Sequence, residues 1–208
     1  MKTKTVVIAL SAALGLTGCA ALFGTDYAGM TSKMFQASFS ERGIAKKERV
    51  NQDETNLACT AADVAGKDVD PVVRARLEAA NMKTIQFPAD GKFLGDWKLG
   101  EREAQSGRGM TYSDTAGSPN GGNCYNCHQI TKTEISYGTL GPSLYQYGKL
   151  RGYSDDIVKY TWGKIYNAKG YNLCTNMPRF GHEKLLTEKQ MKDIMALLLD
   201  PNSPVNKD

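Results

Sequence analysis

Cys124-Tyr125-Asn126-Cys127-His128 is the stretch that decides the interpretation of this chain. The pattern Cys-x-x-Cys-His is typical of the covalent attachment of haem c. Two thiols at this spacing can form thioethers with the two vinyl groups on one edge of a porphyrin. The histidine that follows is then placed to bind the iron as its proximal ligand. The motif therefore predicts one covalently attached haem c, held by Cys124 and Cys127 and ligated by His128.

Two other kinds of site use a Cys-x-x-Cys pair. A redox-active pair usually opens a helix directly after a strand, and the preceding residues 120–123, Asn-Gly-Gly-Asn, are not strand-like. A zinc site needs four ligands, and the remaining Cys59, Cys174 and His182 are too scattered to supply them. The haem interpretation is therefore favoured over both.

The N-terminal residues 1–18 have the features of a secretion signal. Lys2 and Lys4 precede an apolar run over residues 6–16, which is too short to span a bilayer as a mature helix. A secretion signal predicts export to the periplasm, the compartment in which haem c is assembled. The signal and the haem motif thus indicate the same location independently.

The signal ends in Leu16-Thr17-Gly18-Cys19, which resembles a bacterial lipobox. In that case Cys19 becomes the lipidated first residue, and its anchor tethers the protein to a membrane face without spanning it. The alternative is ordinary cleavage after residue 20 or 21, where the small side chains are also acceptable. Membrane contact is expected only through this anchor.

The cysteine count predicts a disulfide. Of five cysteines, Cys19 and the haem pair account for three, and Cys59 and Cys174 remain. An even remainder in an oxidising compartment favours a disulfide, with two buried free thiols as the alternative. The bond would join the N-terminal segment to the haem region.

Composition and local signals predict a soluble, all-α protein. Charged residues make up 23% of the chain, the formal net charge is +4, and no basic run suggests binding to nucleic acid. No stretch shows the sustained alternation of a strand.

Helices are expected over residues 40–62, from Pro71 up to Phe87-Pro88, from an Asp96 cap to residue 106, over residues 154–167, and from a Thr187/Gln190 capping box to Asp200-Pro201. We assign residues 19–94 to a helical N-terminal extension and residues 95–208 to the haem domain.

A second axial ligand is expected downstream of the haem motif. Met191 and Met195 recur at helical spacing and are interpreted as core residues. Met177 lies in a non-helical stretch in which Pro178 holds the residue before it extended, which suits a thioether presented to iron. His182 is the alternative ligand. The choice matters because His/Met ligation gives a higher reduction potential than His/His ligation.

The segment Gly138-Thr-Leu-Gly-Pro-Ser-Leu144 contains a Gly-Pro-x-Leu feature. Small monohaem cytochromes of the His/Met type share it, and this resemblance suggests that the carbonyl of Pro142 accepts the second N–H of the proximal imidazole. The alternative is an ordinary Gly-Pro turn.

The region from Gly95 to the end resembles the SoxX family, the monohaem subunits of the SoxAX cytochrome complex of sulfur-oxidising bacteria. The matching pieces are residues 122–128, 138–144, Tyr147-Gly148, Met-Pro-Arg-Phe-Gly-His (177–182), 186–188 and Asp-Pro-Asn-Ser-Pro-Val-Asn (200–206). The 177–181 piece and the 200–206 tail are the discriminating ones. The resemblance implies a class I cytochrome c-like domain with His128 and Met177 as the axial ligands.

The resemblance also implies a function. SoxAX couples thiosulfate oxidatively to a cysteine of the carrier protein SoxYZ, with the bond-forming chemistry at the SoxA haem. A SoxX subunit forms a heterodimer with SoxA, accepts the electrons and passes them to a small soluble cytochrome c. It is then a non-catalytic electron-transfer subunit of an L-cysteine S-thiosulfotransferase, and no residue of this chain is expected to be catalytic.

Three other functions remain as alternatives. The first is a free-standing, membrane-tethered cytochrome c that shuttles electrons without a stable partner. The second is a peroxidase-like or ligand-sensing haem protein, which Met177 argues against because such a protein needs an open coordination position. The third is a structural lipoprotein with a fortuitous haem motif.

Overall fold

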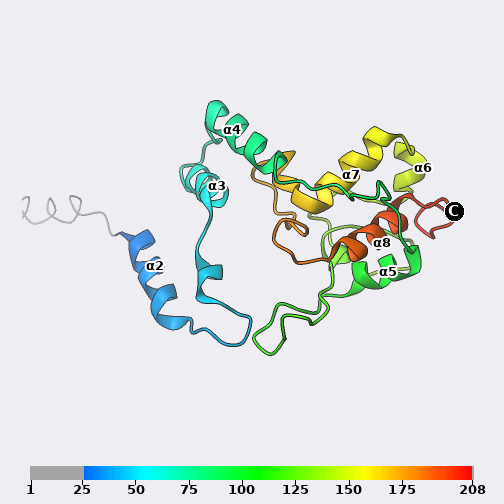
Figure 1. The fold of residues 1–208 in the computed structure, drawn as a ribbon. Coiled ribbons are helices and arrows are strands. Elements are labelled where there is room, and N and C mark those ends of the chain that lie inside the picture. Colours follow the sequence, from blue (N-terminus) through cyan, green and yellow to red (C-terminus); the bar gives the residue numbers. More distant parts are fainter. Residues whose placement is uncertain (1–25, 208) are drawn as a thin grey trace, which may run out of the picture. The chain divides into compact units, whose positions relative to one another are not determined.

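The computed structural model describes residues 26–207, and this range contains helices, turns and loops but no β-strand (Figure 1). The all-α prediction is therefore confirmed for the described residues. The predicted signal segment and the candidate lipidation site Cys19 lie outside them. The chain divides into two compact units, one ending at Ser40 and the other running from Glu41 onward.

The first unit contains helix α2, Tyr27–Ser38. Asp26 caps this helix, and its side chain accepts a hydrogen bond of 2.8 Å from the backbone amide of Gly29. No side chain of α2 is buried. The sequence analysis missed this helix. The signal that could have found it was Asp26 as N-cap, followed by Met30 and Met34 one turn apart.

The second unit contains the remaining helices of the described range. They are α3 (Glu54–Val64), α4 (Pro71–Met82), α5 (Trp97–Gln105), α6 (Tyr147–Arg151), α7 (Asp155–Asn167) and α8 (Glu188–Leu199), with 3-10 turns at Lys47–Val50, Cys124–Asn126 and Ala168–Gly170. Residues 41–94 thus belong to the same compact unit as the haem motif. The boundary between an extension over residues 19–94 and a haem domain over residues 95–208 stays a prediction.

The expectation of one helix over residues 40–62 is wrong. Gly43 adopts a left-handed conformation with φ +56°, and a Cβ at this position would overlap the carbonyl oxygen of Tyr112. The chain therefore turns here and cannot continue as a helix. A new helix begins only at Glu54, where the Asp53 side chain accepts a 2.8 Å hydrogen bond from the amide of Asn56.

The other predicted helix starts are confirmed by their caps. Asp70 accepts from two backbone amides of α4, Asp96 from one of α5, and Thr187 and Gln190 form the reciprocal capping box of α8. Helix α4 ends earlier than expected, at Met82. Here the amide and the hydroxyl of Thr84 both donate to the carbonyl of Asn81, at 3.0 and 2.7 Å, and the amide of Ile85 bonds Met82 in place of Asn81.

Helices α5 and α8 lie side by side and form the centre of the main core (Figure 1). They approach closely at Gly100, where a Cβ would overlap the carbonyl oxygen of Asp193. The side chain of Asp193 also accepts a 2.8 Å hydrogen bond from the amide of Asp96 and thereby holds the start of α5 against α8. Met191 and Met195 are buried in this core, as their spacing predicted.

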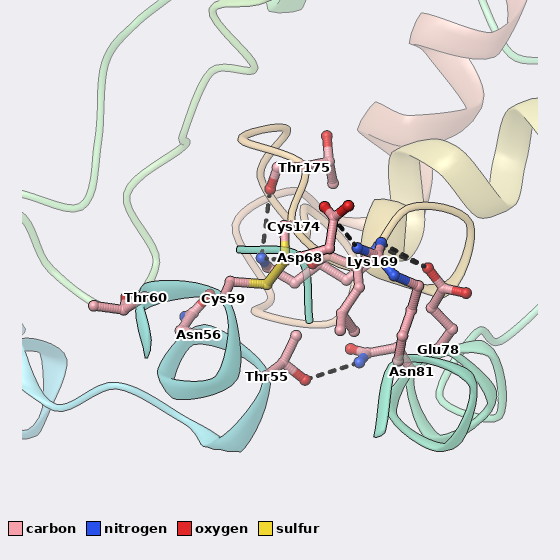
Figure 2. The surroundings of a disulfide bond; sticks show 12 residues. Thr55, Asn56, Cys59, Thr60, Asp68, Glu78, Asn81, Lys169, Cys174 and Thr175 are labelled. Atoms are coloured by element: carbon pink, nitrogen blue, oxygen red, sulfur yellow. Dashed lines mark hydrogen bonds and ion pairs between the residues drawn. A yellow bond between two sulfur atoms is a disulfide. The ribbon is translucent and has the colours of Figure 1, made fainter. Parts of the chain in front are cut away.

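A smaller cluster joins the N-terminal helices to the loop after α7. Its buried centre is Val69, Leu77 and Leu173, with Cys59 of α3 packed against it. The structure links Cys59 to Cys174 by the disulfide expected from the cysteine count, with 5.5 Å between their Cα atoms (Figure 2). Helices α3 and α4 are therefore attached to the region that carries the haem motif.

Candidate haem site

The haem motif forms a tight turn. Cys124–Asn126 is a single 3-10 turn, and the amides of Cys127 and His128 both donate to the carbonyl of Cys124, at 3.1 and 2.9 Å. The residue before the turn, Asn123, has a left-handed φ of +50°. Asparagine tolerates this conformation better than most residues. The turn brings the two cysteines and the histidine to the wall of one cavity.

This cavity has a volume of about 250 Å³ and is mostly apolar. Cys124, Cys127 and His128 line one part of it. The apolar part of the wall comes from the loops that follow the motif and from α7 and α8, namely Ile130, Leu144, Ile165, Met177, Pro178, Phe180, Ile194, Leu197 and Leu198. Pockets lined by apolar side chains with a few polar groups are typical of cofactor sites.

A second cavity, of about 410 Å³, adjoins the first. Residues that line both cavities are Cys127, His128, Leu144, Ile165, Met177 and Leu198. The second cavity is more polar, and its wall includes the cationic side chains of Arg151 and Lys164. The two cavities therefore share a wall that contains Cys127, His128 and Met177, and the two cationic side chains lie on the wall of the second cavity alone.

The imidazole of His128 is held in one orientation. Its Nδ1 lies 2.7 Å from the carbonyl oxygen of Pro142, and because a carbonyl can only accept, Nδ1 carries the proton. Nε2 is then the ring nitrogen that can bind a metal. Gly141 packs against the ring so closely that a Cβ there would overlap it. The residue suggested as the acceptor by the family resemblance is therefore the one that makes this contact.

Of the two candidate distal ligands, Met177 lies at the site and His182 does not. Met177 lines both cavities together with His128. His182 lines neither, and its Nε2 is 3.9 Å from a carboxylate oxygen of Glu183. The pairing of His128 with Met177 is thus the one that the fold favours.

The environment of Cys124 does not fit a redox-active dithiol. Burial raises the pKa of this thiol to about 12, whereas a reactive cysteine needs a lowered pKa. Across residues 26–207, no three His, Cys, Asp or Glu side chains are grouped closely enough to form a zinc site. The two alternatives to haem attachment therefore find no support in the local geometry.

The sequence analysis missed the side chains that fix the motif to α5. Tyr125 is buried and donates a 2.8 Å hydrogen bond to Oε1 of Glu101, and its hydroxyl also lies 2.9 Å from Oγ1 of Thr131. Burial raises the pKa of both Tyr125 and Glu101. The partners are 24 residues apart, so no local pattern indicated the contact.

No protein-family model matches the chain. The chain is 37% identical, over 167 residues, to an uncharacterized lipoprotein of Aquifex aeolicus (strain VF5), and the match covers 78% of this chain and 76% of the relative. The chain belongs to this lipoprotein family. Among the described residues of this family member, no helix is both long and apolar enough to cross a membrane.

Proposed function

We propose that this lipoprotein-family chain binds one haem c, attached through Cys124 and Cys127 and ligated by His128 and Met177. The observation that carries the proposal is that all four side chains line one apolar cavity, while Pro142 holds the proximal imidazole with Nε2 available. Bound in this way, the haem supplies reversible one-electron exchange at its iron.

The remaining wall residues have roles that follow from their chemistry. The apolar side chains from α7 and α8 exclude water from the macrocycle and favour the less charged, reduced iron. Arg151 and Lys164 are the cationic side chains of the larger cavity and would face the haem carboxylates. Burial lowers the pKa of Lys164, and a nearby carboxylate would act to raise it.

The proposed fold is a class I cytochrome c-like domain over residues 95–208, preceded by a helical extension. It is supported by the packing of α5, which precedes the haem motif, against the C-terminal helix α8. The proposed location is the periplasm, with Cys19 acylated. That proposal is supported by the lipoprotein designation of the relative and by the lipobox-like sequence.

The proposed function is electron transfer in a SoxAX-type complex. The chain would accept electrons from the haem of a SoxA-type partner during the coupling of thiosulfate to a SoxYZ cysteine and pass them to a small soluble cytochrome c. This is supported by the sequence pieces shared with SoxX, because residues of three of them, among them His128, Pro142 and Met177, lie at the site. The chain itself would have no catalytic residue.

The second candidate function is a free-standing, membrane-tethered electron shuttle. It requires the same haem site but no permanent subunit. The similarity to a lipoprotein favours it, because a lipid anchor already confines the protein to a membrane surface.

Production of the full chain in a bacterium that assembles haem c tests the cofactor. The expected product retains a red chromophore through denaturing electrophoresis, and a colourless chain refutes the proposal. Addition of a SoxA-type cytochrome, SoxYZ and thiosulfate then tests the function. Reduction of this chain's haem that requires both partners supports the Sox proposal, whereas failure to associate with the SoxA-type cytochrome favours the free shuttle.

A further inference from the structure

The segment that carries Met177 is attached to helix α3 at both of its ends. At one end, Cys174 is bonded to Cys59 (Figure 2). At the other end, Nη1 of Arg179 lies 2.6 Å from Oδ2 of Asp53. Asp53 is the N-cap of α3 and Cys59 lies within the helix, so a single short element holds both ends of the segment.

The ion pair at the second end is largely shielded from solvent. The side chain of Arg179 is only 11% exposed, and its other nitrogen, Nη2, lies 2.7 Å from the carboxylate of Glu183. Burial acts to raise the pKa of Asp53, but hydrogen bonds from the amide of Asn56 and from Arg179 outweigh it and lower the pKa. Asp53 is therefore charged at neutral pH. Loss of this charge would leave a poorly solvated guanidinium with one partner fewer.

A buried lysine also holds the first end of the segment. Lys169 is buried, and its Nζ donates hydrogen bonds to the carbonyls of Leu173 and Thr175, at 3.2 and 3.4 Å (Figure 2). These bonds fix the backbone on both sides of Cys174. The disulfide therefore connects α3 to a part of the loop that is already rigid.

The outer side of the segment faces a polar cavity. This cavity, of about 660 Å³, is lined by Asp53 and Asn56 of α3, by Lys169 and Arg179, and by Met177 itself. Asp53 and Arg179, which form the ion pair, both line this cavity. The disulfide is the second connection between α3 and residues 174–179.

We propose that α3 is a clamp for the axial methionine, in which the Cys59–Cys174 bond and the Asp53–Arg179 ion pair keep the Met177 thioether directed at the iron. The inference rests on the proposed haem site and adds to it that residues outside the region 95–208 set how firmly Met177 is held. Asp53, Cys59 and Arg179 are positioning residues, because none of them lines the cavities beside His128.

The rate at which carbon monoxide binds to the reduced, haem-loaded full chain tests the clamp, since carbon monoxide can bind the iron only after Met177 has left. The first variant is Asp53→Asn. Asparagine is an equally good N-cap, so α3 should keep its start while the charge facing Arg179 is removed. We expect carbon monoxide to bind at least about tenfold faster than in the wild type.

Glu54→Gln is the matched control. It removes a 2.5 Å ion pair at the adjacent position, where the partner, Arg76, belongs to α4 and not to residues 174–179. Its rate should stay within about twofold of the wild type. If carbon monoxide binding accelerated equally in both variants, the inference would be overturned, because any weakening of α3 would then be enough to release Met177.

A second experiment needs no variant and so does not depend on whether a variant folds. The disulfide of the folded wild type is first reduced with a phosphine, and the haem is reduced afterwards. Carbon monoxide binding should again accelerate. Unchanged rates in this arm and in Asp53→Asn, with haem attached, would overturn the clamp and leave the proposed haem site standing. A wild-type chain that carries no covalent haem would instead overturn the proposed function.

Discussion

Nδ1 of His128 lies 2.7 Å from the carbonyl oxygen of Pro142, and Gly141 packs against the same imidazole ring. The hydrogen bond sets the tautomer, and the close glycine sets the plane of the ring. Both come from the segment 138–144, which follows the haem motif by only ten residues. This short segment therefore controls the ligand that the motif itself supplies.

Gly141→Ala should disturb the proximal ligand without removing the covalent attachment. Its Cβ would overlap the His128 ring, so the ring must move away from Pro142. We expect a loss of about 1–3 kcal/mol in unfolding free energy and a weakened low-spin optical spectrum. Gly117→Ala is the control, because nothing lies within 4 Å of a Cβ at that position. Equal effects in the two variants would contradict the packing role of Gly141.

Tyr125→Phe should destabilise the protein by about 1–3 kcal/mol, because Glu101 and Thr131 lose a partner in a buried setting. Denaturant unfolding of the haem-loaded protein measures the change. Tyr137→Phe provides the comparison, since this tyrosine is 41% exposed and should tolerate the loss of its hydroxyl. A Tyr125→Phe protein as stable as the wild type would show that the hydroxyl does not fix the motif to α5.

Replacement of both Cys59 and Cys174 by serine should lower the unfolding free energy by about 2–4 kcal/mol, because the bond closes a long loop in the unfolded chain. Haem should remain covalently attached, since the thioether cysteines are untouched. Equilibrium unfolding, followed by the haem absorbance and by circular dichroism, measures the loss. An unchanged midpoint would mean that the α3 region contributes nothing to the cooperative unit.

The ion pair of Asp53 predicts a pH dependence. Because the pKa of Asp53 is lowered in the folded state, its contribution to stability is fully present above the ordinary aspartate pKa of about 3.9 and is lost as the pH falls through the lower folded value. The stability difference between the wild type and Asp53→Asn should therefore be constant near neutral pH and shrink below about pH 4. A difference that grows on acidification would contradict this assignment.

Local signals predicted the parts of the fold that caps determine. Asp70, Asp96 and the Thr187/Gln190 pair start their helices as expected, because a cap acts within one turn of sequence. The single helix over residues 40–62 failed because Gly43 turns under the influence of Tyr112, which is distant in the sequence. The contact between Gly43 and Tyr112 thus outweighed the local preference for a helix.

The residues of the candidate site likewise fall into those that the local sequence predicted and those that it did not. Spacing indicated Cys124 and His128, and the proline after Met177 indicated that methionine. The resemblance to small monohaem cytochromes suggested Pro142, and the structure brings these residues to one place. The side chains that secure these residues were not predicted. The pairs Tyr125 with Glu101 and Arg179 with Asp53 join segments that are distant in the sequence, so no local pattern encodes them.

The optical spectrum of Met177→Ala, beside that of His182→Ala, tests the central claim most directly. We predict that both variants keep their covalent haem, that Met177→Ala loses the low-spin six-coordinate spectrum, and that His182→Ala retains it. A Met177→Ala protein with an unchanged low-spin spectrum would contradict the proposed axial pair, and a wild-type chain without covalent haem would contradict the site as a whole.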